Sequence, residues 1–256
     1  MKSVLSDIEG GIGRVTLNRP DRMNAINVAL AHALESAIDQ LGDRQDVNVI
    51  VIRGAGGNFC AGGDFDEVQR LRAEGSAELR TLFTSFKAAC EAITRAKVPV
   101  VAAIEGVAMA GGFELMQAAD IVLVADEARI ADNHINFGMI PGGGSTARLP
   151  RLLGRQQALG LLLSGDKITG SAAVQLGLAY KGFPAETFDE SVETFLAKLA
   201  GRDRSALTTI KRLVIDGLNK DFDIANSDET DAVVWRIGGQ AGQAGVSAFK
   251  NREVKA

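Results

Sequence analysis

Residues 98–120, VPVVAAIEGVAMAGGFELMQAAD, constrain the fold of this chain more than any other stretch. The stretch begins with an apolar, β-branched run, residues 98–104, which predicts a buried strand. Small residues follow, and a helical pattern begins at Phe113. A strand that passes through glycines into a helix leaves unpaired backbone N–H groups at the helix N-terminus, where they can hold a developing negative charge. Glu114 stands beside these groups, so we expect this stretch to carry chemistry.

The size and charge of the chain narrow its class. A chain of 256 residues suits one large domain or a domain with an appendage. The net charge of −4 argues against a nucleic-acid surface, and no apolar run approaches the ~20 residues of a membrane-spanning helix. The N-terminus lacks the apolar region of a signal peptide. Cys60 and Cys90 have no CxxC spacing, so we expect a reduced, cytoplasmic protein.

Strand and helix patterns alternate along the first two thirds of the chain, which predicts an α/β fold. Alternating polarity over residues 4–17 predicts a β-hairpin, and residues 47–53 and 121–125 predict buried strands. A helix is expected from Asn27, with His32 on its solvated face, and two helices are expected over residues 68–96 with a break at Gly75. Ser164 to Asp166 should end one helix, while Thr169 and Ser205 should cap later ones. The helix over residues 76–96 carries an apolar stripe, typical of core but able to border an acyl chain: Leu79, Phe83, Phe86, Cys90 and Ile93.

The glycine-rich segment 54–64 has two open interpretations. It is either a flexible surface loop or a loop whose backbone approaches a ligand closely, which glycine permits. Asp64 is placed to cap the helix that follows. Cys60 has no histidine or other base near it in sequence, so a packing role is expected.

Two glycine motifs in the sequence do not indicate nucleotide binding. Residues 142–147 match GxGxxA, but Pro141 and a mixed polar segment precede them instead of a buried strand. Residues 106–112 lack the Lys-Ser/Thr pair of a P-loop. No cysteine or second histidine stands at ligand spacing from His134, so no metal site is expected.

The ordered set of motifs resembles the enoyl-CoA hydratase/isomerase (crotonase) family over nearly the whole chain. The motifs are NRP at 18–20 with MNA at 23–25, NFCAGGD at 58–64, EGVAMAGGFE at 105–114, GMIPGGG at 138–144, LSGD at 163–166 and GVSAF at 245–249. The resemblance implies a spiral of ββα units over residues 1–200. It also implies a C-terminal helical region, 201–256, that forms trimers or dimers of trimers.

The resemblance further implies an acyl-CoA thioester substrate, with coenzyme A as part of that substrate and no covalently bound cofactor. The two backbone N–H groups of the family's oxyanion hole fall on Gly63 and Gly111. Donors of this kind are typically worth ~3–4 kcal/mol each against the barrier of enolate formation. The helix dipole at Gly111 agrees with this role.

Hydratases of the family use two glutamates to hold a water and move protons to C2. The first position falls on Glu114, which otherwise reads as a first-turn glutamate favoured by the helix dipole. The second falls on His134, whose alternative interpretation is a hydrogen-bonded turn residue. Histidine can still act as acid or base, but this position loses a carboxylate.

The resemblance places the CoA moiety near Ala61, Gly62, Gly63 and Asp64. At the C-terminal positions where the family carries an aromatic and a basic residue, Phe249 and Arg252 are expected to reach CoA bound to a neighbouring subunit. The leading hypothesis is hydration of a trans-2-enoyl-CoA. The alternatives are a family isomerase, decarboxylase or thioester hydrolase, or a non-catalytic relative that binds acyl-CoA or RNA.

Overall fold

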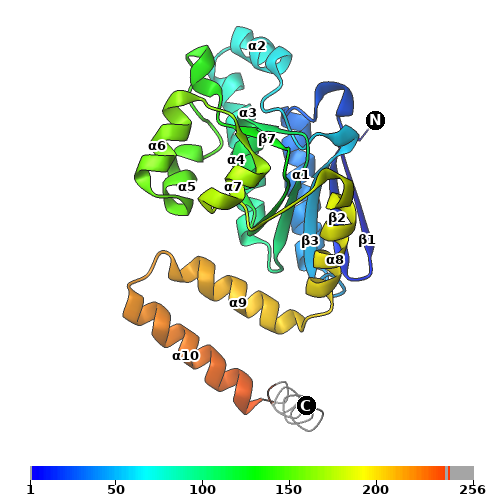
Figure 1. The fold of residues 1–256 in the computed structure, drawn as a ribbon, viewed down its shortest axis with the longest axis vertical. Helices are drawn as coiled ribbons and strands as arrows, with labels where there is room; N and C mark the ends of the chain where they lie inside the picture. The colour runs from blue at the N-terminus through cyan, green and yellow to red at the C-terminus, as the bar shows by residue number, and fades with distance from the viewer. Residues whose placement is uncertain (1, 240–241, 243–256) are drawn as a thin grey trace. The chain divides into compact units, whose positions relative to one another are not determined.

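The computed structural model describes residues 2–239 and 242. The chain divides into two compact units, residues 1–204 and 205–256. The first unit mixes strands and helices, as expected from the sequence, and the described part of the second is helical (Figure 1).

A six-stranded sheet runs through the first unit in the order β1-β2-β3-β4-β6-β9. The predicted hairpin is present, because β1 and β2 pair antiparallel, whereas every later pair in this sheet is parallel. All five residues of β4 are buried, as expected for a parallel strand covered on both faces. The bounds are β1 (Val4–Glu9), β2 (Ile12–Leu17), β3 (Val49–Gly54), β4 (Val100–Ile104), β6 (Ile121–Ala125) and β9 (Lys181–Phe183).

A smaller sheet contains the strand that leads into the glycine turn at 110–112. It contains β5 (Val107–Met109), β7 (Arg129–Ala131) and β8 (Ile168–Thr169), with β5 parallel and β8 antiparallel to β7. Gly106, with φ +59°, lies between β4 and β5, and a Cβ there would lie 2.1 Å from the carbonyl oxygen of Gly57. Glycine at 106 therefore permits the tight turn between β4 and β5. The helix α4 (Gly111–Ala118) begins two residues earlier than the pattern at Phe113 indicated.

The helices begin and end largely where local sequence signals predict. Asn27 caps α1 by accepting a hydrogen bond from Leu30 N at 2.8 Å, and Gly75, with φ +130°, separates α2 from α3. Gly165 ends α6, and Thr169 caps α7. The remaining bounds are η1 (Pro20–Arg22), α1 (Val28–Asp43), η2 (Ala55–Gly57), α2 (Phe65–Glu74), α3 (Ser76–Arg95), η3 (His134–Phe137), α5 (Ser145–Leu152), α6 (Arg155–Ser164), α7 (Gly170–Leu176), η4 (Ala185–Thr187) and α8 (Phe188–Ala200).

Two helix predictions need correction. Phe83 does not belong to the core, because it is 41% exposed and its ring lies against Gly142. The helix α9 (Arg204–Gly217) begins one residue before the expected cap at Ser205. Arg204 anchors that start, since its guanidinium donates to the carbonyl oxygens of Val47 and Arg44, both at 3.0 Å.

The second unit contains α9 from Ser205 onward and the whole of α10 (Phe222–Gly238). Arg236 near the end of α10 donates to the hydroxyl of Ser205 at 3.3 Å, so the two helices form a hairpin. Large apolar side chains of this unit are exposed, among them Leu218 (76%), Phe222 (80%) and Trp235 (75%). In the part of the chain that the structure describes, no helix combines the length and apolar character needed to cross a bilayer.

Candidate active site

Two backbone segments meet where β5 turns into α4. Cys60 pairs with this turn as a strand residue would, because its N–H donates to Val107 O at 2.9 Å and its carbonyl accepts from Met109 N at 3.0 Å. A Cβ on Gly112 would lie 2.0 Å from Cys60 O. Glycine at 112 is therefore required for the close approach of the segment 60–63 to the first turn of α4.

The same approach brings Gly63 and Gly111 together. A Cβ on Gly111 would lie 3.5 Å from Gly62 Cα and 3.6 Å from the Gly62 carbonyl carbon, which is bonded to Gly63 N. The N–H groups of Gly63 and Gly111 donate no hydrogen bond within the described residues. The site thus offers two adjacent unpaired donors, an arrangement that can bind an anionic oxygen.

Glu114 lies in the first turn of α4 with 2% of its surface exposed. Its Oε1 accepts hydrogen bonds from Gly143 N at 2.7 Å and Ser145 N at 3.1 Å, at the start of α5. Burial raises the pKa of Glu114, although these two N–H groups and the charge of His134 oppose the rise. A buried carboxyl whose pKa is raised, beside an anion-binding turn, is a candidate for proton transfer.

The glycine run 142–144 lets the backbone reach this carboxylate. A Cβ on Gly143 would lie 2.1 Å from Phe86 Cε1 and 3.1 Å from Glu114 Oε2. A Cβ on Gly142 would lie 2.5 Å from Phe83 Cδ1. The segment that matches GxGxxA therefore packs against two aromatic rings and holds Glu114 through its N–H groups.

His134 lies just beyond β7, and its ring is held by Asp132. The His134 Nδ1 to Asp132 Oδ1 distance is 2.6 Å, and Asp132 is 1% exposed. Burial lowers the pKa of His134, but the hydrogen bond and charge of Asp132 and the charge of Glu114 outweigh it and leave the pKa raised. Position 134 itself carries no carboxylate, but Asp132 places one against the Nδ1 side of the imidazole. Sequence reasoning missed this contact because it depends on the turn at Asn133, whose φ of −100° and ψ of 14° lead from β7 into η3.

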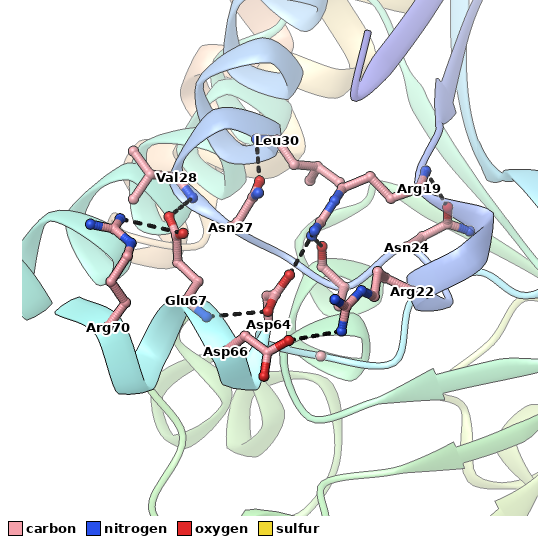
Figure 2. Close-up of polar contacts among 12 residues, drawn as sticks. Arg19, Arg22, Asn24, Asn27, Val28, Leu30, Asp64, Asp66, Glu67 and Arg70 are labelled. Carbon is pink, nitrogen blue, oxygen red and sulfur yellow. Dashed lines mark hydrogen bonds and ion pairs between the residues drawn. The ribbon is translucent and has the colours of Figure 1, made fainter. Parts of the chain in front are cut away.

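A network around Arg19 joins three chain segments next to Gly63 (Figure 2). Arg19 Nη2 donates to Asp64 Oδ2 at 2.6 Å, and Arg19 Nη1 donates to Ala25 O at 2.5 Å. The other oxygen of Asp64 accepts from Glu67 N at 3.2 Å, so the predicted helix cap is confirmed. Sequence reasoning assigned no role to Arg19, because its partner lies 45 residues away.

Nearly the whole chain matches a known family. The family model described as Enoyl-CoA hydratase/isomerase matches residues 7–253. The chain belongs to the enoyl-CoA hydratase/isomerase family. This family assignment confirms the resemblance predicted from the motifs, and with it an enzyme of the hydratase type.

Individual relatives agree with this family over nearly their full lengths. The chain is 31% identical to a probable enoyl-CoA hydratase from Rhodobacter capsulatus, covering 95% of this chain and 93% of that one. It is 30% identical to a crotonyl-CoA hydratase from Syntrophomonas wolfei, with coverages of 97% and 95%. The crystal structure of an enoyl-CoA hydratase from Bacillus anthracis superposes with a TM-score of 0.92 at 27% identity, covering 98% and 96%. The predicted crotonase-type α/β fold is thereby confirmed.

The residues predicted from the family to bind CoA have different structural settings. Ala61 N donates to Met23 O at 3.0 Å, and Gly62 is buried with φ +110°. The side chain of Asp64 is already engaged by Arg19 and by the start of α2. Phe249 and Arg252 lie outside the described residues.

Two expectations about other residues are confirmed. Cys60 is fully buried, and burial raises the pKa of its thiol to about 12, so its role is packing. His32 is exposed, and its Nε2 lies 2.7 Å from the hydroxyl of Ser85.

Proposed function

We propose that this family member adds water across the double bond of a trans-2-enoyl-CoA thioester. The observation that carries the proposal is the buried Glu114, held by two N–H groups beside a glycine turn with two unpaired backbone donors. A proton-transfer group and an anion-binding site thus lie within one turn of helix. The relative from Syntrophomonas wolfei is named for the hydration of crotonyl-CoA, which supports this substrate class.

The oxyanion hole consists of the N–H groups of Gly63 and Gly111. They bind the thioester oxygen, so the electron pair of the C2=C3 bond can move into the thioester as an enolate. The water oxygen then bonds to C3, one proton of that water is taken by the acid/base pair, and C2 receives a proton. Each donor is worth about 3–4 kcal/mol against the barrier.

Glu114 and His134 form the acid/base pair, and Asp132 holds the imidazole. Because Asp132 engages Nδ1, the free Nε2 is the atom that exchanges protons with the substrate side. The charge of each residue acts on the pKa of the other, so the protonation of one depends on the protonation of the other.

The CoA moiety lies along Ala61 to Asp64, with Phe249 and Arg252 reaching it from a neighbouring subunit. A cation at 252 suits the phosphates of the nucleotide. The subunits form a trimer or a dimer of trimers through the C-terminal helices. The exposed Phe222 and Trp235 support this assembly, because large apolar side chains at the surface mark interaction sites. Two buried, unpaired cysteines fit the cytoplasm as the compartment.

The test is a hydration assay with crotonyl-CoA and longer enoyl-CoA thioesters, following loss of absorbance of the conjugated double bond. We expect turnover with at least one chain length and its loss in the Glu114→Gln variant. Tight binding of these thioesters without turnover of any of them would overturn the hydration proposal.

Thioester hydrolysis is a second candidate, favoured by the carboxylate–imidazole pair of Asp132 and His134. Such a pair can activate water for attack on a carbonyl carbon whose oxygen lies in an oxyanion hole. Hydrolysis releases free CoA, whereas hydration does not, so a thiol reagent separates the two reactions. His134→Glu should increase hydration relative to hydrolysis if the histidine directs the second reaction.

A further inference from the structure

The peptide groups on both sides of Gly63 are held by one residue, Ile26. Ile26 N donates to Gly62 O at 2.7 Å, and Asp64 N donates to Ile26 O at 2.8 Å. Gly63 itself is exposed and, within the described residues, its N–H has no partner. The direction of this N–H therefore depends on how firmly Ile26 and Asp64 are placed.

Ile26 ends a turn that carries backbone strain. Met23 and Asn24 have φ values of +46° and +57°, a left-handed region that non-glycine residues rarely adopt. Arg19 closes this turn, because its N–H donates to Asn24 Oδ1 at 2.9 Å and its carbonyl accepts from Asn24 N at 2.9 Å. The Asn24 amide in turn donates to the carbonyl oxygens of Ala55 and Asn58. The surrounding contacts thus fix a conformation that the turn alone does not favour.

The Arg19 side chain connects the two supports of Gly63. One nitrogen donates to Ala25 O in the turn, and the other donates to Asp64 on the far side of Gly63. Figure 2 shows Arg19 reaching toward Asp64. The side chains of Arg19 and Asp64 are 20% and 9% exposed, so the ion pair is shielded from solvent. A planar guanidinium can make both contacts in fixed directions, which a lysine ammonium cannot.

We propose that Arg19 is a positioning residue of the oxyanion hole, acting through Asp64 and the turn at 23–26 to hold the Gly63 N–H in place. This inference rests on the proposed function, because it assigns Gly63 as an oxyanion donor. It also gives Asp64 a positioning role, with its carboxylate bound to Arg19 instead of to CoA.

The neighbouring pair of Arg22 and Asp66 offers a matched control. It joins the same turn to the same helix (Figure 2). The distance is 2.9 Å, but the two side chains are 56% and 71% exposed. An exposed pair contributes little, and neither residue flanks Gly63. Arg22→Met therefore removes an equivalent charge without releasing the donor.

The experiment uses 4-(dimethylamino)cinnamoyl-CoA, a thioester whose absorption moves to longer wavelength when its carbonyl oxygen is polarised. The full-length wild type, Arg19→Met, Arg19→Lys, Asp64→Asn and Arg22→Met are compared for this shift, for probe affinity and for kcat and KM with crotonyl-CoA. We expect Arg19→Met and Asp64→Asn to bind the probe but lose most of the shift, with kcat falling about 10- to 100-fold, the cost of misplacing a group by roughly 1 Å. Arg19→Lys should restore part of the shift, and Arg22→Met should match the wild type.

Several outcomes overturn the inference. A full shift and wild-type kcat in both Arg19→Met and Asp64→Asn would show that the pair is not needed to position Gly63. If Arg19→Met does not fold, Asp64→Asn decides alone, because asparagine still caps α2. Absence of any shift in the wild type would refute the oxyanion hole and the inference together. A wild-type shift without hydration of any enoyl-CoA would refute only the reaction, and the variants would still test Arg19.

Discussion

Replacing Gly143 with alanine tests whether the glycine run positions the carboxylate of Glu114. The added Cβ would lie 2.1 Å from Phe86 Cε1, whereas ordinary van der Waals contact begins at 3.4 Å. The loop or the ring must therefore retreat by about the difference, roughly 1.3 Å. Phe86 is only 5% exposed, so its ring has little room to turn away.

Both ways of relieving this clash have a measurable cost. Movement of the ring overpacks the core and should lower the free energy of unfolding by about 1–3 kcal/mol. Movement of the loop carries Gly143 N beyond hydrogen-bond distance of Glu114 Oε1, now 2.7 Å away. Because that bond holds down the pKa of Glu114, its loss should raise the pKa further.

The assay is the pH dependence of kcat/KM, which reports the ionisation of the free enzyme. The base must be deprotonated, so a higher pKa of Glu114 moves the acidic limb of the profile to higher pH. Gly142→Ala is the control, because its Cβ would meet Phe83, a 41% exposed ring that can turn toward solvent. If Gly143→Ala keeps the wild-type profile and is as stable as Gly142→Ala, the reasoning is refuted.

Three further predictions concern the acid/base residues and the assembly. Glu114→Gln should lower kcat about 10²–10⁴-fold. The folded-state pKa of Glu114 is raised, so its protonated form contributes to the free energy of unfolding below the ordinary carboxyl pKa, and this contribution is lost as pH rises through the folded-state pKa. Urea unfolding at pH values that span these two pKa values should show the loss in the wild type but not in the variant. Asp132→Asn should lower the pKa of His134, which NMR titration of that imidazole can follow, and an unchanged pKa would contradict the role of Asp132. Trp235→Glu should reduce the assembly to smaller species in light scattering, and an unchanged mass would argue against the α9–α10 hairpin as the contact.

Much of the fold could be predicted because its signals are local. The strand β6 has the predicted bounds, α1 follows the Asn27 cap, and Gly75 breaks the helix between α2 and α3 as expected. Apolar periodicity and capping residues act within a few positions of one another, so they can be read without tertiary information.

The partners of Glu114 could not be found in the same way. Gly143 and Ser145 lie 29 and 31 residues further along the chain, and only the packing of α5 beside α4 brings their N–H groups to the carboxylate. The exposure of Phe83 has the same origin. Its helical spacing matches a core stripe, yet its ring lies against Gly142, a residue distant in sequence, and is 41% exposed. Asp132 lies only two residues from His134, but the contact depends on the non-extended backbone of Asn133 between them, which no local pattern predicts.

The position of Asp132 changes what the histidine means for the reaction. Two glutamates that share one proton carry a net charge of −1, and a glutamate with an imidazole that shares one proton carries none. Adding the carboxylate of Asp132, 2.6 Å from the ring, returns the net charge to −1. In the proposed mechanism, the enolate in the oxyanion hole therefore faces the same overall charge as in a two-glutamate site, but the proton can reside on a nitrogen base. Hydration and hydrolysis both remain accessible to such a group, and they differ in the carbon that water attacks. The choice between the two reactions then depends on whether the water is held nearer to C3 or to the thioester carbon. The product assay reports this choice, because only attack on the thioester carbon releases free CoA.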